Sequence, residues 1–294
     1  MMRYRKSFGD VAFTTANSIL MLLLIALTLY PLLYVLFASL SDPTRIVSYR
    51  GVLWAPQGFT LAAYEMVVAN PMIAIGYRNT LFYVVVGTAL NLALTILGAY
   101  GLSRKNLLWK TPIMFLIVFT MFFSGGLVPI YLLVAQTLRL DNSAWALIIP
   151  GAISTYNLIV MRTSFQAIPE ALEEAARIDG ANDFTLLTRI VLPLSMPVIA
   201  VMILFYAVGH WNSWFPAMIY LRDRALFPLQ LVLREILIFS STDNMMTSVT
   251  GDRMPIGETI KYATIVVATV PILCIYPFLQ RYFVKGVMIG AIKE

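Results

Sequence analysis

The sequence has very little charge. Of its 294 residues, only 12% are Asp, Glu, Lys or Arg, whereas 60% are hydrophobic. Soluble domains usually carry about 25% charged residues, so this chain has too little polar surface to cover itself in water. The shortage of charge excludes an ordinary soluble protein and indicates a membrane protein.

Cysteine and histidine are almost absent as well. The single cysteine, Cys274, cannot form an internal disulfide, and with the single histidine, His210, it supplies too few ligands for a structural zinc site. The net charge of +6 comes from basic residues scattered at the ends of hydrophobic runs. Such residues flank membrane spans and do not form a nucleic-acid stripe. We therefore expect no metal site and no nucleic-acid partner.

Signatures of catalysis are also missing. No stretch reads G-x-x-x-x-G-K-[ST], the phosphate-binding loop of many ATPases. The hydrophobic runs contain no histidine cluster, no paired carboxylates and no nucleophile motif. We therefore expect a chain that is not an enzyme and that holds no cofactor of its own.

Six hydrophobic stretches are long enough to cross a bilayer, which takes about 20 helical residues. Strict alternation of apolar and polar residues is absent, which favours helices over a barrel. The first stretch follows a basic N-terminus but is too long for a signal peptide, so it is expected to remain. The sequence predicts an all-α integral membrane protein with six transmembrane helices, in one domain over residues 1–294. The spans are residues 15–40, 79–103, 111–135, 144–162, 196–221 and 261–283.

Two of these spans contain helix breakers. The third includes Ser124-Gly125-Gly126 and then Pro129, and the sixth includes Pro271 and Pro277. Proline removes a backbone donor and clashes with the preceding turn. We expect each of these positions to kink its helix or to end it early.

Lysine and arginine indicate the orientation. With six spans, both termini lie on the same side of the membrane. The short loop 104–110, on that side, carries three basic residues, whereas the short opposite loop 136–143 carries only Arg139. Short loops rich in Lys and Arg stay in the cytoplasm. The prediction is a multi-pass protein of the cell membrane with both termini, and the interval 162–195, in the cytoplasm.

The polar interval 162–195 predicts two short helices joined by a tight turn. Pro169 suits a first helical turn, and three glutamates that follow it place negative charge near the positive end of a helix: Glu170, Glu173 and Glu174. Asp179-Gly180 is a stop signal, because glycine reaches left-handed angles at little cost. Asn182 or Asp183 can cap a second helix that runs to Pro193. An amphipathic loop lying on the membrane surface is the alternative.

The same interval carries a recognisable signature. Glu174-Ala175-Ala176, three residues, Gly180, nine residues, Ile190, one residue and Leu192-Pro193 resemble the EAA signature of ABC importer permeases. The six spans, with Trp211-Asn212-Ser213-Trp214 and the tail Gln280-Arg281-Tyr282-Phe283-Val284-Lys285-Gly286, resemble the carbohydrate branch that includes the second permease of the maltose system. The stretch Ser124-Gly125-Gly126-Leu127-Val128-Pro129 is similar to an oligosaccharide subgroup.

The resemblance implies a transmembrane permease of an ATP-driven, binding-protein-dependent importer of bacterial membranes. Its partners would be a second, homologous permease, a dimer of cytoplasmic ATPase subunits that hold the ATP and Mg²⁺, and an extracytoplasmic solute-binding protein. The loop between spans four and five would dock into the ATPase, and an outer loop, 222–260, would reach into the binding protein's cleft. The residues that the resemblance places in ATPase coupling are Glu174, Ala175, Ala176, Asp179 and Gly180.

A sugar cargo would need aromatic faces and amides deep in the membrane, where polar side chains usually face the protein interior. Spans four and five contain residues of that kind: Tyr156, Asn157, His210, Trp211, Asn212 and Trp214. Span two adds Asn91. Interfacial aromatic belts and helix–helix hydrogen bonds are the alternatives for these residues. For the whole chain, the alternatives are a permease for a non-sugar solute and a membrane scaffold that transports nothing.

Overall fold

A computed structural model describes residues 8–246, 259–274 and 277 of the chain. The described residues are mostly helical and form no β-strand beyond one isolated bridge. The chain divides into two compact units. Residues 1–70 and 235–270 form the first unit, and residues 71–234 and 271–294 form the second.

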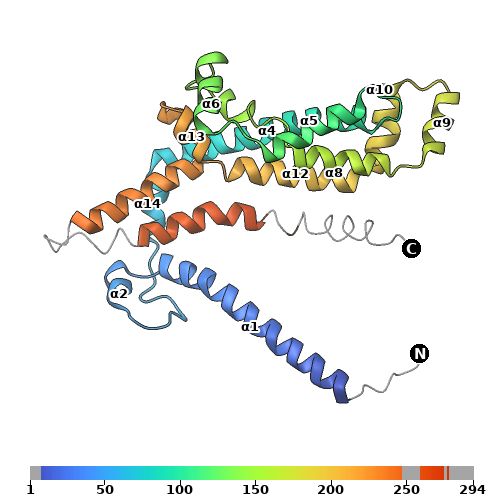
Figure 1. Cartoon of the computed structure of the whole chain (residues 1–294). Helices are drawn as coiled ribbons and strands as arrows, with labels where there is room; N and C mark the ends of the chain where they lie inside the picture. Colours follow the sequence, from blue (N-terminus) through green and yellow to red (C-terminus); the bar gives the residue numbers. More distant parts are fainter. Residues whose placement is uncertain (1–7, 247–258, 275–276, 278–294) are drawn as a thin grey trace. The chain divides into compact units, whose positions relative to one another are not determined.

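A long apolar helix, α1 (Phe8–Ser39), dominates the first unit (Figure 1). It runs through Pro31 without ending, and none of its most apolar window is buried. A helix that exposes hydrophobic side chains all round suits a lipid environment. The end of α1 packs into a small core of Ala38, Ile46 and Leu53, against which Tyr34, Phe37 and Tyr262 lie.

Shorter helices complete the first unit. They are α2 (Pro43–Ser48), α3 (Ala62–Ala69) and the start of a helix over Thr259–Cys274. Asp42 caps α2, because its carboxylate accepts a hydrogen bond from the backbone N–H of Thr44 at 2.9 Å. Helix α14 (Leu229–Met246) begins in the second unit and ends in the first.

Three helices pack side by side in the second unit: α4 (Pro71–Ser103), α8 (Thr155–Gln166) and α12 (Met196–Trp211) (Figure 1). Helix α4 is unbroken over 33 residues. The apolar core between these helices consists of Ala99, Leu102, Leu158, Met161, Phe165, Leu187, Val191, Ile199 and Met202. Because this core includes residues of all three helices, it fixes their packing near the C-terminal end of α4.

Two helical segments of the second unit bend sharply. Helix α5 (Lys110–Phe122) is followed at 112° by a segment made of α6 (Leu127–Leu132) and the π-helical η1 (Leu133–Thr137). A second segment meets α12 at 84°. It consists of α10 (Asp183–Leu186), the π-helical η2 (Leu187–Val191) and α11 (Leu192–Leu194).

The remaining elements of this unit are short. They are α7 (Trp145–Ile148), α9 (Glu170–Ile178), α13 (Phe215–Tyr220) and the 3-10 turn η3 (Arg224–Leu226). Asn79 on α4 holds η3 in place, since its amide donates to the carbonyls of Ala225 at 2.7 Å and Phe227 at 3.0 Å.

By length and composition, α1 and α4 are each able to cross a membrane. Counting each bent pair as one span raises the number to four within the described residues, and the helix over Thr259–Cys274 is apolar but shorter. Helix α1 begins at Phe8 and α4 at Pro71, so both start before the predicted spans at 15 and 79.

The remaining span predictions need correction. The third, 111–135, is broken at Phe123–Gly126, where the glycine pair was expected to end the helix. The fourth, 144–162, is not one helix: α7 stops at Ile148 and α8 begins at Thr155, because Pro150 and Gly151 disfavour helix between them. The fifth, 196–221, is divided into α12 and α13 around Asn212–Trp214.

The sixth span is described only in part. Its helix runs past Pro271 to Cys274, so Pro271 does not end the helix, and the predicted kink at Pro271 stays a prediction. Residues 275–276 and 278–294, which include the tail Gln280–Gly286, lie outside the described residues, so the predicted break at Pro277 and the end of the span at 283 stay predictions.

Candidate functional site

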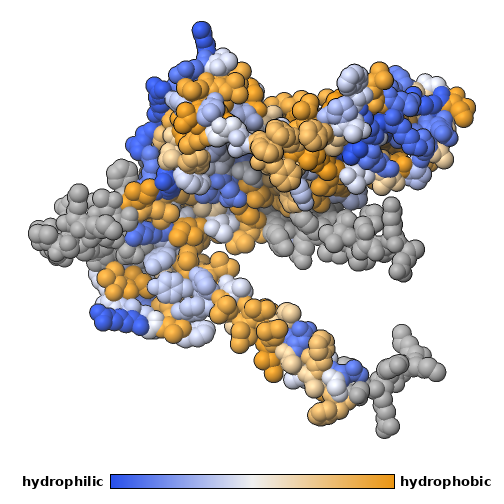
Figure 2. Space-filling model, in the orientation of Figure 1, coloured by the Kyte–Doolittle hydropathy of each residue, from blue (hydrophilic) through white to orange (hydrophobic). Residues whose placement is uncertain are grey.

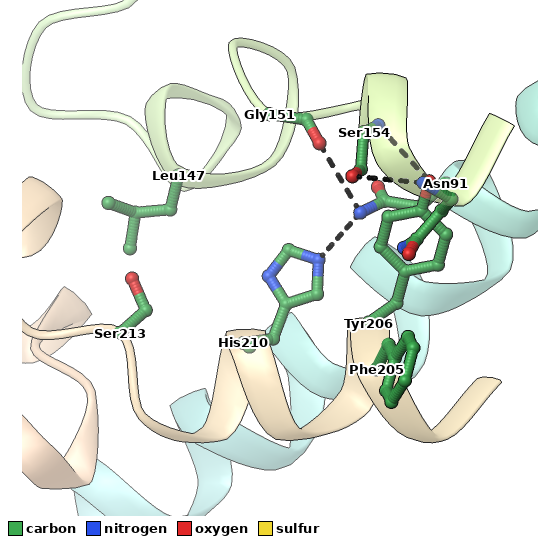
Figure 3. Close-up of a pocket in the computed structure, with 10 residues that line it drawn as sticks. Asn91, Leu147, Gly151, Ser154, Phe205, Tyr206, His210 and Ser213 are labelled. Carbon is green, nitrogen blue, oxygen red and sulfur yellow. Dashed lines mark hydrogen bonds between the residues drawn. The ribbon is translucent and has the colours of Figure 1, made fainter. Parts of the chain in front are cut away.

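A cavity of about 420 Å³ opens between α4, α12 and the chain that joins α7 to α8 (Figure 3). Small-ligand pockets usually measure about 300–1,000 Å³, so this cavity has room for a small organic group. Its lining residues are Asn91, Leu147, Gly151, Ser154, Asn157, Phe205, Tyr206, Gly209, His210 and Ser213.

Asn91 ties the cavity walls together. Its side-chain amide donates to the carbonyl of Gly151 at 3.4 Å and lies 3.2 Å from Nε2 of His210 (Figure 3). The amide nitrogen is a donor only, so Nε2 accepts. Asn91 is 2% exposed, and its side-chain oxygen is buried without a hydrogen-bond partner among the described residues. A buried oxygen without a hydrogen bond destabilises the folded protein. A ligand donor, or a small rearrangement that supplies a donor, would remove this cost at Asn91.

Tyr206 provides a second polar link one turn along α12. Its hydroxyl lies 2.7 Å from the hydroxyl of Thr95 on α4 and accepts a hydrogen bond from the backbone N–H of Ser154 at 3.1 Å. Ser154 in turn caps α8, because its hydroxyl accepts from the N–H of Asn157 at 3.4 Å. These bonds fix the polar side chains of the cavity before any ligand arrives, as a binding site requires.

A glycine on α4 makes room for the imidazole of His210. A Cβ atom at Gly87 would lie 2.6 Å from Cε1 and 2.9 Å from Cδ2 of that ring. Such distances are far inside normal van der Waals contact. Glycine at position 87 is therefore required for His210 to lie where it does.

The cavity lining can bind the hydroxyl groups of a ligand. Six of the lining side chains offer hydroxyl, amide or imidazole groups, Leu147 and Phe205 offer apolar surface, and none of the ten is Asp, Glu, Lys or Arg. Hydroxyl groups need partners of this kind when they leave water. The chemistry of the lining suits binding and release, and it does not resemble a hydrolytic centre.

The structure brings together only some of the predicted substrate-lining residues. Asn157 and His210 line the cavity. Tyr156 does not, since it is 56% exposed on another side of α8, and Trp211 is buried with its ring 6.3 Å from that of Tyr77. Asn212 is exposed at the end of α12.

Trp214 lies beneath a cation rather than in the cavity. The guanidinium of Arg234 sits 4.3 Å from the centre of its ring, and Phe215 packs against its edge. His210 and Trp211 are successive residues of α12 and point in different directions, and residues 212–214 are not helical, so the run 210–214 does not line one surface.

Helical spacing would have indicated the residues that sequence reasoning missed. Tyr206, His210 and Ser213 recur at intervals of four and three along α12 and its end, and Asn91 and Thr95 are four apart on α4. Residues three or four apart share a helix face. Leu147, Gly151 and Ser154 are also four and three residues apart, but the chain between α7 and α8 that holds Gly151 and Ser154 is not helical, so helical spacing is not what places them at the cavity.

The second candidate site is an elbow formed by α9, a turn and α10. Asp179 ends α9, and Gly180 follows with φ of +83°. The N–H of Gly180 donates to the carbonyl of Arg177 at 3.0 Å, and that of Ala181 donates to Ala176 at 2.9 Å. This pair of bonds is the Schellman ending of a helix, which favours glycine at the left-handed position. The predicted stop at Asp179-Gly180 is confirmed.

Asn182 starts the second arm of the elbow. Its side-chain oxygen accepts from the N–H of Thr185 at 2.8 Å, so Asn182, and not Asp183, is the cap of α10. At the other end Pro169 stands just before α9 and not inside its first turn. The helical segment then continues to Leu194, as the position of Pro193 predicts.

The elbow is largely exposed. No residue of α9 is buried, and two large apolar side chains beside the turn, Ile178 and Phe184, are 86% and 71% exposed. Figure 2 shows hydrophilic residues gathered at this end of the second unit. Glu174 and Ala175 are exposed too, and Glu174 makes no hydrogen bond or ion pair with any described residue. This surface is open to a partner.

Two ion pairs connect α9 to the end of α4. Arg104 pairs with Glu173, and Lys105 pairs with Glu170. The first pair is mostly shielded from solvent, with side-chain exposures of 19% and 18%, whereas the second is open at 74% and 55%. The hydrogen bond that Lys105 donates to the carboxylate of Glu170 raises the pKa of Lys105 above its ordinary value. A third exposed pair, between Arg177 and Asp183, crosses the turn at 2.6 Å.

No metal centre is evident in the part of the chain that the structure describes. No three His, Cys, Asp or Glu side chains there lie close enough together to hold an ion.

Comparison with known families identifies the architecture. Residues 103–289 match the family described as binding-protein-dependent transport system inner membrane component. The chain belongs to this family. The match includes the elbow, α8 and α12, so both candidate sites lie within or beside the defining region of the family.

Two bacterial relatives are similar over nearly the whole chain. The polygalacturonan/rhamnogalacturonan transport system permease protein YtcP of Bacillus subtilis (strain 168) is 45% identical over 264 residues, covering 90% of this chain and 92% of the relative. Protein LplC of the same organism is 43% identical over 272 residues, covering 91% and 90%. The permease is thus a multi-pass inner-membrane component of a transport system.

A solved structure shares the fold. A chain from a bacterial ABC transporter involved in the import of the acidic polysaccharide alginate superposes with a TM-score of 0.87 and 31% sequence identity, covering 96% of this permease and all of that chain.

Proposed function

We propose that this permease is a transmembrane subunit of an ATP-driven, binding-protein-dependent importer of sugars, with oligosaccharides as its cargo. The observation that carries the proposal is the 45% identity to a polygalacturonan/rhamnogalacturonan permease over nine-tenths of the chain. The cavity adds chemical support, because its lining offers hydroxyl, amide and imidazole groups that can bind the hydroxyl groups of a sugar.

The proposal gives the cavity a role in the passage of the sugar. Asn157 and His210 would bind hydroxyl groups, together with Asn91, Ser213 and Tyr206, while Phe205 would cover the apolar face of a ring. A hydrated sugar finds no hydrogen-bond partners in lipid, so a lined cavity that opens to alternate sides provides a route. Alternating opening is a rigid-body change between two packed states.

The elbow would receive the driving force. In the proposed assembly, a dimer of ATPase subunits holds the ATP and Mg²⁺ and docks on α9, with Glu174 pairing with a basic residue and Ala175 and Ala176 lying in a cleft. Asp179 and Gly180 form the turn. A second, homologous permease and an extracytoplasmic binding protein complete the complex. No cofactor is assigned to this chain.

The proposal also keeps the six-span topology, with both termini and the elbow in the cytoplasm. In the proposed topology, the four candidate spans would be joined by two further membrane segments, one containing α8 and the other the helix over Thr259–Cys274. Part of the outer loop, residues 247–258, lies outside the described residues, so its contact with the binding protein rests on the family resemblance.

Purification of the membrane complex tests the proposal. The tagged permease should co-elute with an ATPase, a second permease and, in the presence of cargo, a binding protein, and mass spectrometry should detect a bound oligosaccharide. A complex with an amino acid, peptide or ion would favour the non-sugar alternative. A permease that elutes without any ATPase would indicate a scaffold and overturn the proposal.

A further inference from the structure

The attachment of α9 to the rest of the permease poses a mechanical question. A helix that receives force must be fixed to what it moves, yet none of the residues of α9 is buried. Hydrophobic packing, the usual source of helix attachment, therefore contributes little here. What remains are the two chain connections, the exposed Arg177–Asp183 pair within the elbow, and the ion pairs with Arg104 and Lys105.

The chain connections are indirect. Toward α8, α9 continues through Ala167, Ile168 and Pro169, which are not helical. Toward α12, it continues through the glycine turn and then through the 84° bend. A movement of α9 can be absorbed at each of these joints.

Arg104 offers a direct route. Its guanidinium donates to Glu173, donates to the hydroxyl of Ser103 at 3.1 Å from Nε and 2.8 Å from Nη2, and lies 4.4 Å from the ring centre of Tyr100. Its carbonyl accepts a hydrogen bond from Lys110 at 3.0 Å. An arginine held on several sides loses little further freedom when it binds a carboxylate.

Helix α4 continues from this anchor to the cavity without a break. Arg104 directly follows α4, and Asn91 and Thr95 lie on the same helix. At 1.5 Å per residue, Asn91 is about 20 Å from Arg104 along the axis. A displacement of Glu173 along this axis therefore reaches the cavity wall through one rigid element.

We propose that the Arg104–Glu173 pair couples α9 directly to α4, with both side chains acting as positioning residues for transport. The inference rests on the proposed function. The two neighbouring carboxylates then have different roles: Glu173 attaches α9 to α4 of this permease, and Glu174 stays available to pair with the ATPase. The exposed Lys105–Glu170 pair joins the same two segments but is open to water, where ion pairs contribute little.

The test uses the complete importer in proteoliposomes, with binding protein loaded with a fluorescent oligogalacturonide. Arg104→Gln and Glu173→Gln should lower sugar uptake per ATP hydrolysed by roughly tenfold or more, as expected for an unpaired, shielded charge. Basal ATP hydrolysis and subunit co-purification should persist. The charge exchange R104E/E173R should restore part of the uptake, and the control variants Lys105→Gln and Glu170→Gln should couple normally.

A second measurement covers variants that fail to assemble. In a Cys274→Ser background, spin labels at Val85→Cys on α4 and Ala171→Cys on α9 report the distance between the two helices. The distribution of distances between the two labels should be narrow in the parent, broad with Arg104→Gln and as narrow as in the parent with Lys105→Gln. Equal widths, normal coupling in Arg104→Gln, or equal losses in the Lys105→Gln control would each overturn the inference. A parent complex that takes up no sugar would count against the proposed function instead.

Discussion

Nε2 of His210 lies 3.2 Å from the side-chain amide nitrogen of Asn91, and this contact joins α12 to α4 across the candidate cavity. It exists because Gly87, one turn before Asn91 on α4, leaves room for the imidazole. The lack of a side chain at Gly87 on α4 thus determines where the imidazole of His210, on α12, lies in the cavity.

Replacing that glycine should therefore damage the cavity. The methyl group of Gly87→Ala would clash with the imidazole ring of His210. The free energy of unfolding in detergent should therefore fall by about 1–3 kcal/mol, as in other overpacked cores. Sugar uptake should fall as well. Gly101→Ala is the matched control on the same helix, since a Cβ there meets no atom within 4 Å. Equal stability and uptake in the two variants would contradict the assigned role of Gly87.

Two neighbouring residues allow a test of whether the cavity itself binds the sugar. Ser213 lines the cavity, whereas Asn212 is exposed and does not. Loss of one neutral hydrogen bond costs about 0.5–1.5 kcal/mol, so Ser213→Ala should raise the KM for sugar uptake by roughly threefold to tenfold. Asn212→Ala should leave KM unchanged, and the reverse ranking would place the sugar elsewhere.

The turn of the elbow makes a separate prediction. Gly180 has φ of +83°, and a Cβ there would meet no neighbouring atom, so only backbone strain opposes a side chain. Left-handed conformations cost most residues about 1–2 kcal/mol, and asparagine adopts them more readily. Gly180→Ala should therefore weaken ATP-driven uptake, and Gly180→Asn should retain most of it. Uptake that is equal in all three proteins would remove the turn from the mechanism.

The free carboxylate of the elbow should matter for assembly and not for folding. Glu174→Lys changes an exposed side chain that makes no hydrogen bond or ion pair with a described residue, so the unfolding temperature should stay close to that of the parent. Co-purification with the ATPase and coupled hydrolysis should both be lost. The control is Glu65→Lys on α3, the same charge reversal at another exposed site. An intact complex with Glu174→Lys would exclude this residue from docking.

The topology can be tested because the chain has one cysteine. In a Cys274→Ser background, a membrane-impermeant maleimide added to intact cells should label Gln136→Cys and should not label Ala171→Cys. Both should react after the membrane is opened. Labelling of Ala171→Cys in intact cells would put the elbow outside the cytoplasm and reverse the proposed orientation.

Local chemistry made the elbow predictable. Gly180 and Asn182 act through backbone hydrogen bonds within a few residues, so the sequence contains all the information that their geometry needs. The break after α5 was predictable for the same reason. Which glutamate pairs with Arg104 was not, because 69 residues separate Arg104 from Glu173.

The cavity required knowledge of tertiary packing. Its walls come from α4, α12 and the chain between α7 and α8, and the sequence does not state which faces of these elements meet. Hydrophobicity alone also overestimated helix length, because an apolar stretch such as 144–162 suits a membrane whether its backbone is helical or broken. Backbone breaks inside the membrane need buried partners, and Gly151 has one in Asn91.

The right-angled junction between the α10–α11 segment and α12 has a consequence of its own. Because the two segments meet nearly at a right angle, a displacement along the α10–α11 segment does not run along the axis of α12. Tyr206 and His210 lie on α12, whereas Asn91 and Thr95 lie on the unbroken α4. A displacement that reaches α4 through Arg104 and is absorbed before α12 would slide the two cavity walls past each other, so that a bound sugar is released by sliding and not by widening of the cavity.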